Sequence, residues 1–300
     1  MPILRDMKDK RNLYVDLHAW ERNAVNLDGW LTNFEVTDRE RATRLANCLT
    51  YFSSEMSDQL LLASWERLSA HITRNAQTSS EAELLWANFL DNTVIITIIG
   101  EEENVTDSGN FIARRLRQLL RFDQNQVLGW DDGLRAVEKN PNLNVVLVDD
   151  FVGTGGQLDA AFKRPLMIGS KTVMLASLAQ SHPNINIFLC LMAATESGLG
   201  AIDEIYPWLK IFSGTLISRQ LSLVNDESEL FNVSERAAML DFIKRYSVKI
   251  GYSAEDKTRR DWRGFGSLGH IMAFSHSVPD CTFPIIHSED NGWIPLVVRS

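Results

Sequence analysis

Apolar residues recur with two different periods along this chain, and the pattern changes near residue 91. Before that point, between residues 45 and 68, apolar positions are spaced three and four apart, as on one face of a helix. Thr37 with Glu40 and Ser80 with Glu83 are interpreted as capping boxes at helix starts, since each has the form Ser/Thr-x-x-Glu. The pattern therefore predicts a helical N-terminal region over residues 1–90.

After residue 91, short apolar runs alternate with amphipathic segments. We expect strands at residues 93–99, 145–148, 186–192 and 210–213, and helices at residues 111–121, 131–139, 158–162, 173–179 and 200–209. This alternation predicts the α/β class, with a parallel sheet and right-handed crossovers over residues 91–215. A further helix is expected at residues 234–246. Residues 251–300, rich in glycine, proline, histidine and aromatic residues, are expected to form ordered loops with one or two strands.

Length and composition limit the class of protein. The chain has 300 residues, of which 45% are hydrophobic, enough for a sizeable core. No apolar run reaches about 20 residues, so no membrane span is expected. The charged segment 1–22 lacks the apolar core of a signal peptide, so we expect a cytoplasmic protein. The net charge of −9 argues against autonomous, nonspecific nucleic-acid binding.

The cysteines, histidines and basic clusters carry weaker signals. Three cysteines and six histidines show no metal-ligand or disulfide spacing, so no metal site made by protein ligands is expected. Basic clusters at residues 114–121 and 257–263 are interpreted as solvated faces or as binding patches. Four tryptophans of the N-terminal region are interpreted either as core residues or as anchors for a partner chain: Trp20, Trp30, Trp65 and Trp86.

The strongest chemical signal is an apolar run that leads into two carboxylates and a glycine-rich turn. After residues 145–148 come Asp149 and Asp150, and the turn consists of Gly153, Thr154, Gly155, Gly156 and Gln157. Ligands of open α/β sheets bind beyond the carboxyl ends of strands, so the carboxylates are placed where a ligand would lie. Backbone N–H groups of the turn and the start of the next helix suit a phosphate. The alternative is ordinary turn chemistry at a strand end.

This segment resembles the phosphoribosyl-pyrophosphate fingerprint of type I phosphoribosyltransferases: an apolar strand, two acidic residues, small or apolar residues, then Thr-Gly-Gly. The resemblance implies that Asp149 and Asp150 bind the ribose 2′- and 3′-hydroxyls and that residues 153–156 wrap the 5′-phosphate. The family usually closes the loop with Thr or Ser, and Gln157 at this position removes one hydroxyl donor. The resemblance also implies Mg²⁺ as a cofactor, bound with phosphoribosyl pyrophosphate.

The loop at residues 100–110 follows the first expected strand, and a comparable loop of the same family receives the pyrophosphate. On this resemblance the candidate ligand-binding residues are Ser108, Gly109, Asn110, Arg114 and Arg115. The alternative is an ordinary helix cap made by Asp107 or Ser108. Three consecutive glutamates at residues 101–103 would repel pyrophosphate, so we expect them to face solvent or a cation.

The tail carries a second resemblance. Residues 264–296 contain a glycine-rich turn, an apolar strand, Phe-x-His, two prolines and Trp-x-Pro-Leu. This pattern is similar to a phosphoribosyltransferase-like domain of bacterial conflict and anti-phage systems, including retron modules. It implies such a domain over residues 91–300, with a core at 91–215 and a C-terminal extension at 216–300. It also implies protein partners, a winged-helix protein and a reverse transcriptase with its nucleic acid. His276 would lie near the ligand or buttress it, or serve as a hydrogen-bonded structural histidine.

Three functions remain open at this point. The first is a phosphoribosyltransferase-like effector that binds phosphoribosyl pyrophosphate or a nucleotide, acts at ribose C1′ and serves as a regulated toxin. The second is a non-catalytic nucleotide sensor with the same fold, and the third is a nucleotide-salvage phosphoribosyltransferase. No residue is recognisable as the reader of an acceptor base, and this favours the effector and the sensor over the salvage enzyme.

Overall fold

The computed structural model describes residues 7–98, 108–123, 125–182 and 184–298, and they form two compact units. One unit is continuous in sequence and spans residues 58–216; the other combines residues 1–57 with residues 217–300. The sequence placed its division at residue 90 instead. The helices α4 (Ser54–Thr73) and α5 (Ser79–Asp91), expected in the N-terminal region, contribute to the core of the continuous unit.

A five-stranded sheet in the order β3-β2-β4-β7-β8 forms the centre of the continuous unit. The pairs β2–β3, β2–β4 and β4–β7 are all parallel, which confirms the predicted α/β class with a parallel sheet. Its strands are β2 (Thr93–Thr97), β3 (Val127–Leu128), β4 (Asn144–Val152), β7 (Ile187–Thr195) and β8 (Lys210–Ile217).

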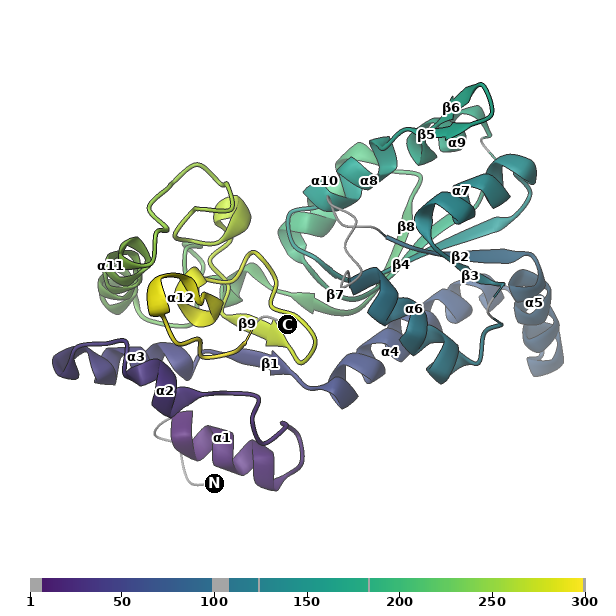
Figure 1. Cartoon of the computed structure of the whole chain (residues 1–300). Helices are drawn as coiled ribbons and strands as arrows, with labels where there is room; N and C mark the ends of the chain where they lie inside the picture. The colour runs from purple at the N-terminus through teal and green to yellow at the C-terminus, as the bar shows by residue number, and fades with distance from the viewer. Residues whose placement is uncertain (1–6, 99–107, 124, 183, 299–300) are drawn as a thin grey trace. The chain divides into compact units, whose positions relative to one another are not determined.

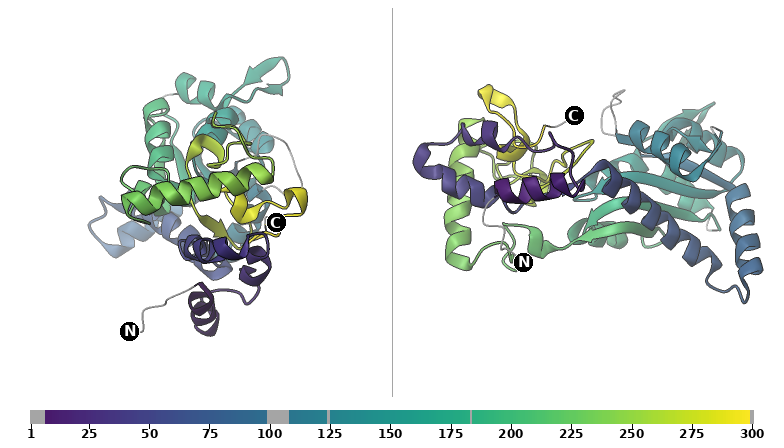
Figure 2. Two further views of the ribbon diagram at one scale, coloured as in Figure 1. Left: turned by 90° about the vertical axis from the view of Figure 1, so that its left-hand side faces the viewer. Right: turned by 90° about the horizontal axis from the view of Figure 1, so that it is seen from below.

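Helices cover both faces of this sheet, as Figure 1 and the right-hand view of Figure 2 show. On one face lie α7 (Trp130–Lys139), α8 (Gly156–Lys163), α9 (Leu175–Ser181) and α10 (Glu196–Ile205). On the other face lie α4, α5 and α6 (Ser108–Leu120). Strand β4 shows the reason: Val145 and Leu147 pack into one core, while Val146 and Val148 pack into the other, as the alternation of a strand requires.

Most of the predicted elements of this unit are present with shifted ends. The expected helix at 173–179 begins only at Leu175, because Val173 belongs to a hairpin of β5 (Leu166–Ile168) and β6 (Lys171–Val173) that the sequence did not reveal. The helix expected at 200–209 begins at Glu196, directly after β7. Strands β4 and β7 extend beyond their apolar runs, so β4 contains both carboxylates.

Both predicted capping boxes are wrong in position. Helix α5 is capped by Thr78, whose hydroxyl accepts a hydrogen bond from the Glu81 N–H, and a Glu81 carboxylate oxygen accepts one from the Gln77 N–H. The Thr-x-x-Glu pair that caps α5 thus lies two residues earlier than Ser80 and Glu83, and its glutamate bonds the residue before the cap. Thr37 lies inside a 3₁₀ turn (Val36–Asp38), and α3 (Arg39–Ala46) follows it with no side-chain cap.

The discontinuous unit joins the first helices of the chain to its C-terminal extension. It contains α1 (Met7–Asp16), α2 (Leu27–Leu31), α3, β1 (Thr50–Phe52), α11 (Val233–Lys249), β9 (Met272–Phe274) and α12 (Pro284–His287). Strand β1 pairs in parallel with β9. One core includes residues from both ends of the chain, among them Trp20, Trp30 and Tyr246. Trp20 and Trp30 are buried in the core of this unit, and Trp65 is buried in the continuous unit, so all three serve as core residues.

Candidate functional site

The two carboxylates lie at the topological switch point of the sheet. The chain runs from β2 outward to β3 and then returns to β4 on the other side of β2. In open α/β sheets, the crevice at such a reversal is where ligands bind, outside the carboxyl ends of the strands. The last β2–β4 pair joins Thr97 to Val148, whereas β4 stays paired with β7 as far as Val152. Asp149 and Asp150 therefore come directly after the point where β2 ends.

Both side chains are buried: Asp149 is 3% exposed and Asp150 is 8% exposed. The Asp150 N–H donates a hydrogen bond of 2.9 Å to the Asp149 Oδ1. A buried carboxylate needs a hydrogen-bonding or charged partner, so two adjacent ones on a central strand are an unusual feature of a core. As acceptors they suit a ligand with neighbouring hydroxyl groups, or a cation.

The turn after β4 leads directly into α8 and exposes its first N–H groups. Gly155 has φ +81, a left-handed conformation that favours glycine. The Gly156 N–H donates to the Thr154 hydroxyl at 3.2 Å, and α8 has no side-chain cap. Gly156 and Gln157 are exposed. An accessible helix start of this kind attracts anions through its N–H groups and its positive dipole end.

The one carboxylate in the first turn of α8 is held by other groups. Asp159 accepts hydrogen bonds from the Tyr206 hydroxyl at 2.7 Å and from Lys163 at 2.9 Å. Burial opposes ionisation of Asp159, but these two partners outweigh it and hold its pKa below the usual value. Its negative charge is thereby compensated within α8 and at the end of α10, which lessens repulsion of an anion at the helix start.

The end of β7 meets the same turn. Residues 194–198 follow the strand expected at 186–192, so the sequence predicts that they approach the same edge of the sheet. Thr195 is buried and donates a hydrogen bond of 2.5 Å to the carbonyl oxygen of Gly153. Its hydroxyl also accepts from the Gly198 N–H at 2.9 Å and so caps α10. Thr195 and Gly198 were not singled out as site residues within that segment, because only the structure reveals their contacts with Gly153.

The early loop is described in part. Ser108, Gly109 and Asn110 form the first turn of α6, and residues 99–107, including the three glutamates and Asp107, lie outside the described residues. The choice between a pyrophosphate site and an ordinary helix cap therefore stays a prediction. Behind that turn, Arg114 is exposed.

Arg115 makes a bidentate ion pair with Asp58, on the face of the sheet that α4 and α6 cover. Its Nε donates to the Asp58 Oδ1 at 2.7 Å and its Nη2 donates to Oδ2, while Nη1 donates to Gln118 at 2.8 Å. This fork geometry ties α6 to α4. A contact from Arg115 to a pyrophosphate would have to compete with Asp58.

His276 belongs to the discontinuous unit and follows β9. It is half-buried, and its ring centroid lies 5.4 Å from that of Phe274. The turn and the carboxylate pair belong to the continuous unit, so the predicted role of His276 beside the ligand stays a prediction. Another histidine of the same unit, His270, is buried, and burial lowers its pKa to about 4, so it is neutral at pH 7.

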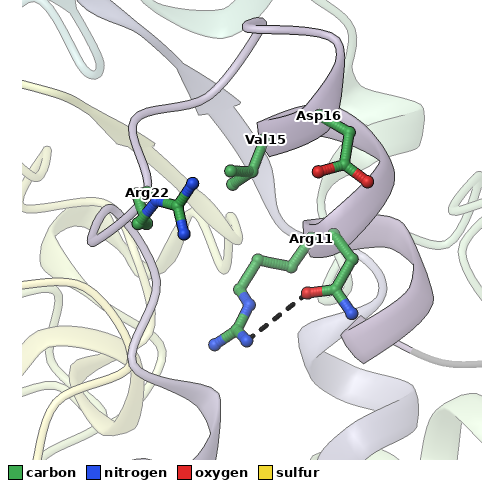
Figure 3. A pocket seen from close by; sticks show the side chains of 5 residues that line it. Arg11, Val15, Asp16 and Arg22 are labelled. Carbon is green, nitrogen blue, oxygen red and sulfur yellow. Dashed lines mark hydrogen bonds between the residues drawn. The ribbon is translucent and has the colours of Figure 1, made fainter.

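A separate cavity lies in the discontinuous unit, between α1 and the segment that follows it. Its volume is about 350 Å³, and it is lined by Arg11, Asn12, Val15, Asp16 and Arg22. In Figure 3 the side chains of Arg11 and Asp16 extend from the helix, and that of Arg22 extends from the segment that follows it. The charged lining of the cavity consists of two arginines and one aspartate.

Taken together, a parallel α/β sheet with an acidic pair at its switch point and a glycine turn opening a helix defines a phosphoribosyltransferase-like protein. Comparison with protein families agrees: the PRTase-CE family matches residues 27–299, and the chain belongs to this family. No curated protein matches the chain. Among solved structures, the AQ2163 protein from Aquifex aeolicus matches 71% of this chain and 92% of its own length at 14% identity, with a TM-score of 0.31.

The family match covers both compact units. It includes the whole of residues 58–216 and nearly all of the discontinuous unit except the first helix region. Among the described residues, no helix is both long and apolar enough to cross a bilayer. The described residues likewise contain no cluster of three or more histidine, cysteine, aspartate or glutamate side chains arranged to hold a metal ion.

Proposed function

We propose that the segment Asp149–Gln157 binds the ribosyl-phosphate part of phosphoribosyl pyrophosphate or of a nucleotide. The observation that carries this proposal is the position of Asp149 and Asp150 at the switch point, directly before a glycine turn that opens α8. The carboxylates would accept hydrogen bonds from the ribose hydroxyls. The N–H groups at the start of α8 would receive the phosphate.

Mg²⁺ fits this site as a companion of the ligand. Magnesium is usually held by one or two carboxylates together with substrate phosphates, and it keeps several waters. Asp149 and Asp150 supply the carboxylates, and the described residues contain no larger protein cluster that could hold the ion alone. The ion would neutralise part of the charge of a departing pyrophosphate.

We further propose that the site acts at ribose C1′. The bond from C1′ to the leaving group breaks, and the leaving group departs with the electron pair of that bond. A nucleophile, either water or an acceptor, forms a new bond to C1′ with its own electron pair. The nucleophile then loses its proton to solvent or to the leaving group. Catalysis of this kind needs the ribose fixed and the leaving charge stabilised, and both tasks fall to positioning and electrostatics. If the site binds without turnover, the protein is a nucleotide sensor.

The test compares the wild-type protein with Asp149→Asn/Asp150→Asn. The control is Asp131→Asn/Asp132→Asn, an adjacent acidic pair exposed on α7 of the same unit, with the same change in charge. Thermal unfolding is measured with and without phosphoribosyl pyrophosphate and Mg²⁺, and mass spectrometry looks for products. At about 100 times Kd, the wild type and the control should gain about 2.7 kcal/mol, and the Asp149/Asp150 variant should gain nothing.

Each outcome separates the candidate functions. Stabilisation with a product supports action at C1′, and stabilisation without one supports the sensor. Product that forms only when a free base is added supports a salvage enzyme. Equal stabilisation of the Asp149/Asp150 variant and the wild type would contradict the proposed site.

We also propose that the protein serves as a regulated cytoplasmic toxin in anti-phage defence. The similarity of the tail to defence domains motivates this role, and the family match is consistent with a phosphoribosyltransferase-like effector domain. A winged-helix protein and a reverse transcriptase with its nucleic acid are the proposed partners. Expression in a bacterial host should arrest growth for the wild type and not for Asp149→Asn/Asp150→Asn, and co-expression of proteins encoded beside the gene should restore it. Arrest by both forms would exclude a toxin that works through this site.

A further inference from the structure

One face of α10 runs along the glycine turn and α8. Within the helix, Gly198 packs against the Gly153 carbonyl and Ile202 packs against Gly155. Tyr206, the residue that ends the helix, donates its hydroxyl to Asp159. Residues spaced four positions apart lie on one side of a helix. The turn after β4 therefore has a continuous support on the side of α10.

The Thr195 hydroxyl connects the two segments at the start of this face. A hydroxyl has one hydrogen to donate, and Thr195 uses it on the carbonyl oxygen of Gly153 at 2.5 Å. Its lone pairs accept from the Gly198 N–H at 2.9 Å, and the Ser197 hydroxyl lies 3.1 Å away. Because Thr195 is 1% exposed, water cannot easily replace these bonds.

Gly198 and Gly155 leave no room for the turn to shift toward α10. A Cβ at position 198 would lie 2.3 Å from the Gly153 carbonyl oxygen, which is backbone and cannot yield by a rotamer change. A Cβ at position 155 would lie 2.8 Å from the Ile202 side chain. The backbone of the turn is thus in direct contact with α10 at two points.

We infer that Thr195 and Gly198 are positioning residues, which hold the Gly153–Gly156 turn in its phosphate-receiving conformation before any ligand arrives. The inference rests on the proposed function for the role of the turn, and on the contacts above for its shape. A turn that is already ordered loses less conformational entropy when it binds a ligand, so binding is tighter. Neither residue needs to touch the ligand.

The first test uses Thr195→Val, which keeps the size of the side chain and removes the hydroxyl, and Thr195→Ser, which restores it. The control is Thr78→Val, which removes the capping hydroxyl of α5 in the same unit and far along the chain from the turn. Hydrogen exchange of the Gly156 and Asp159 amides, both hydrogen-bonded in or next to the turn, reports its opening. Affinity for phosphoribosyl pyrophosphate with Mg²⁺ is measured on the same proteins.

Thr195→Val should speed exchange at these two amides about tenfold and weaken the affinity about tenfold, since it removes two buried hydrogen bonds. Thr195→Ser should restore both quantities, and Thr78→Val should lower Tm without changing either. Exchange at wild-type rates in Thr195→Val, or failure of Thr195→Ser to restore it, would overturn the inference.

The second test uses Gly198→Ala, with Gly133→Ala as its control. A Cβ at position 133 in α7 would lie 2.5 Å from the Ile96 side chain. The control therefore strains the core that contains Ile96 and Ile202, without a contact to the turn. Gly198→Ala should weaken ligand affinity at least as much as Thr195→Val, and Gly133→Ala should leave it unchanged. If the wild type does not bind phosphoribosyl pyrophosphate, the proposed function fails for that ligand, while hydrogen exchange still decides whether Thr195 holds the turn.

Discussion

Single residues decide the shape of several loops in this protein, and Asp261 is the clearest case. Its side chain is fully buried, and it accepts hydrogen bonds from the Arg263 backbone and guanidinium, from the Lys257 N–H and from the Ser267 hydroxyl. Lys257 and Ser267 both have positive φ, at 67° and 56°. Such conformations cost free energy and persist only when the surroundings enforce them, so one carboxylate fixes two strained positions.

Asp261 should make the free energy of unfolding fall at acidic pH. Burial would raise its pKa, but the hydrogen bonds from Arg263, Ser267 and Lys257 lower it to about 2, below the unfolded value of about 3.9. The stabilisation is therefore complete above about pH 4 and is lost as pH falls toward 2. Asp261→Asn should reduce the free energy of unfolding by about 2 kcal/mol at pH 7, and the difference should shrink toward pH 2. Denaturant unfolding across this pH range checks it; a pH-independent difference would contradict it.

The site illustrates how much single residues could be predicted. Asp149, Asp150 and the glycine turn form one short segment, so local sequence was sufficient to identify them as candidates. Thr195 was placed near the site because it follows a predicted strand, yet its bond to Gly153 joins residues 42 apart in sequence. Gly198 lies in the same expected segment, but its contact with the Gly153 carbonyl has no signal in the local sequence.

At the scale of elements, long-range pairing overrides local periodicity. Apolar residues between 45 and 56 have helical spacing, yet α3 ends at Ala46 and Thr50–Phe52 forms β1, paired with β9 at residues 272–274. The strand is stabilised by a partner more than 200 residues away, which no local window contains. Helices and buried parallel strands with strong patterns, such as α7 and β4, were predicted correctly because local preference and tertiary packing agree.

The cap of α5 can be tested directly. Thr78→Ala should reduce the free energy of unfolding of the continuous unit by about 1 kcal/mol, because it removes the hydroxyl that accepts from the Glu81 N–H. Ser80→Ala, inside the helix at an exposed position, should have an effect within about 0.5 kcal/mol. Urea unfolding of both variants gives the comparison. A larger loss of unfolding free energy for Ser80→Ala than for Thr78→Ala would instead favour Ser80 as the cap, as the sequence predicted.

A buried pair connects the segment before α3 to α11. The Tyr246 hydroxyl donates to the Asp38 Oδ2 at 2.7 Å and accepts from the Glu35 N–H at 3.2 Å, while Arg245 donates to the same carboxylate. Tyr246→Phe leaves a buried acceptor and a backbone donor with fewer partners, and should cost about 1–3 kcal/mol. A double-mutant cycle with Asp38→Asn should give a coupling energy above about 0.5 kcal/mol, and additive losses would show that the pair does not interact.

At the scale of the whole molecule, the chain leaves one compact unit and returns to it. Two cores, on the two faces of the sheet, are built from residues 60–212, whereas the third is built from residues 14–51 and 223–297. The sequence could not show this division, because the pattern of each segment is local and the shared core joins distant ones. The PRTase-CE match over residues 27–299 treats both units as one family domain.

Separate cores predict separate folding. A fragment of residues 54–217, which keeps α4 and β8 intact, should unfold cooperatively on its own, since it contains two of the hydrophobic cores. Residues 218–300 alone should stay unfolded, because their core requires residues such as Trp30, which is fully buried and bonded to the Ile285 carbonyl at 2.6 Å. Joining residues 1–53 to 218–300 through a short glycine-serine linker should restore a cooperative transition. Circular dichroism and thermal unfolding of the three fragments measure this, and a cooperative transition of residues 218–300 alone would contradict the shared core.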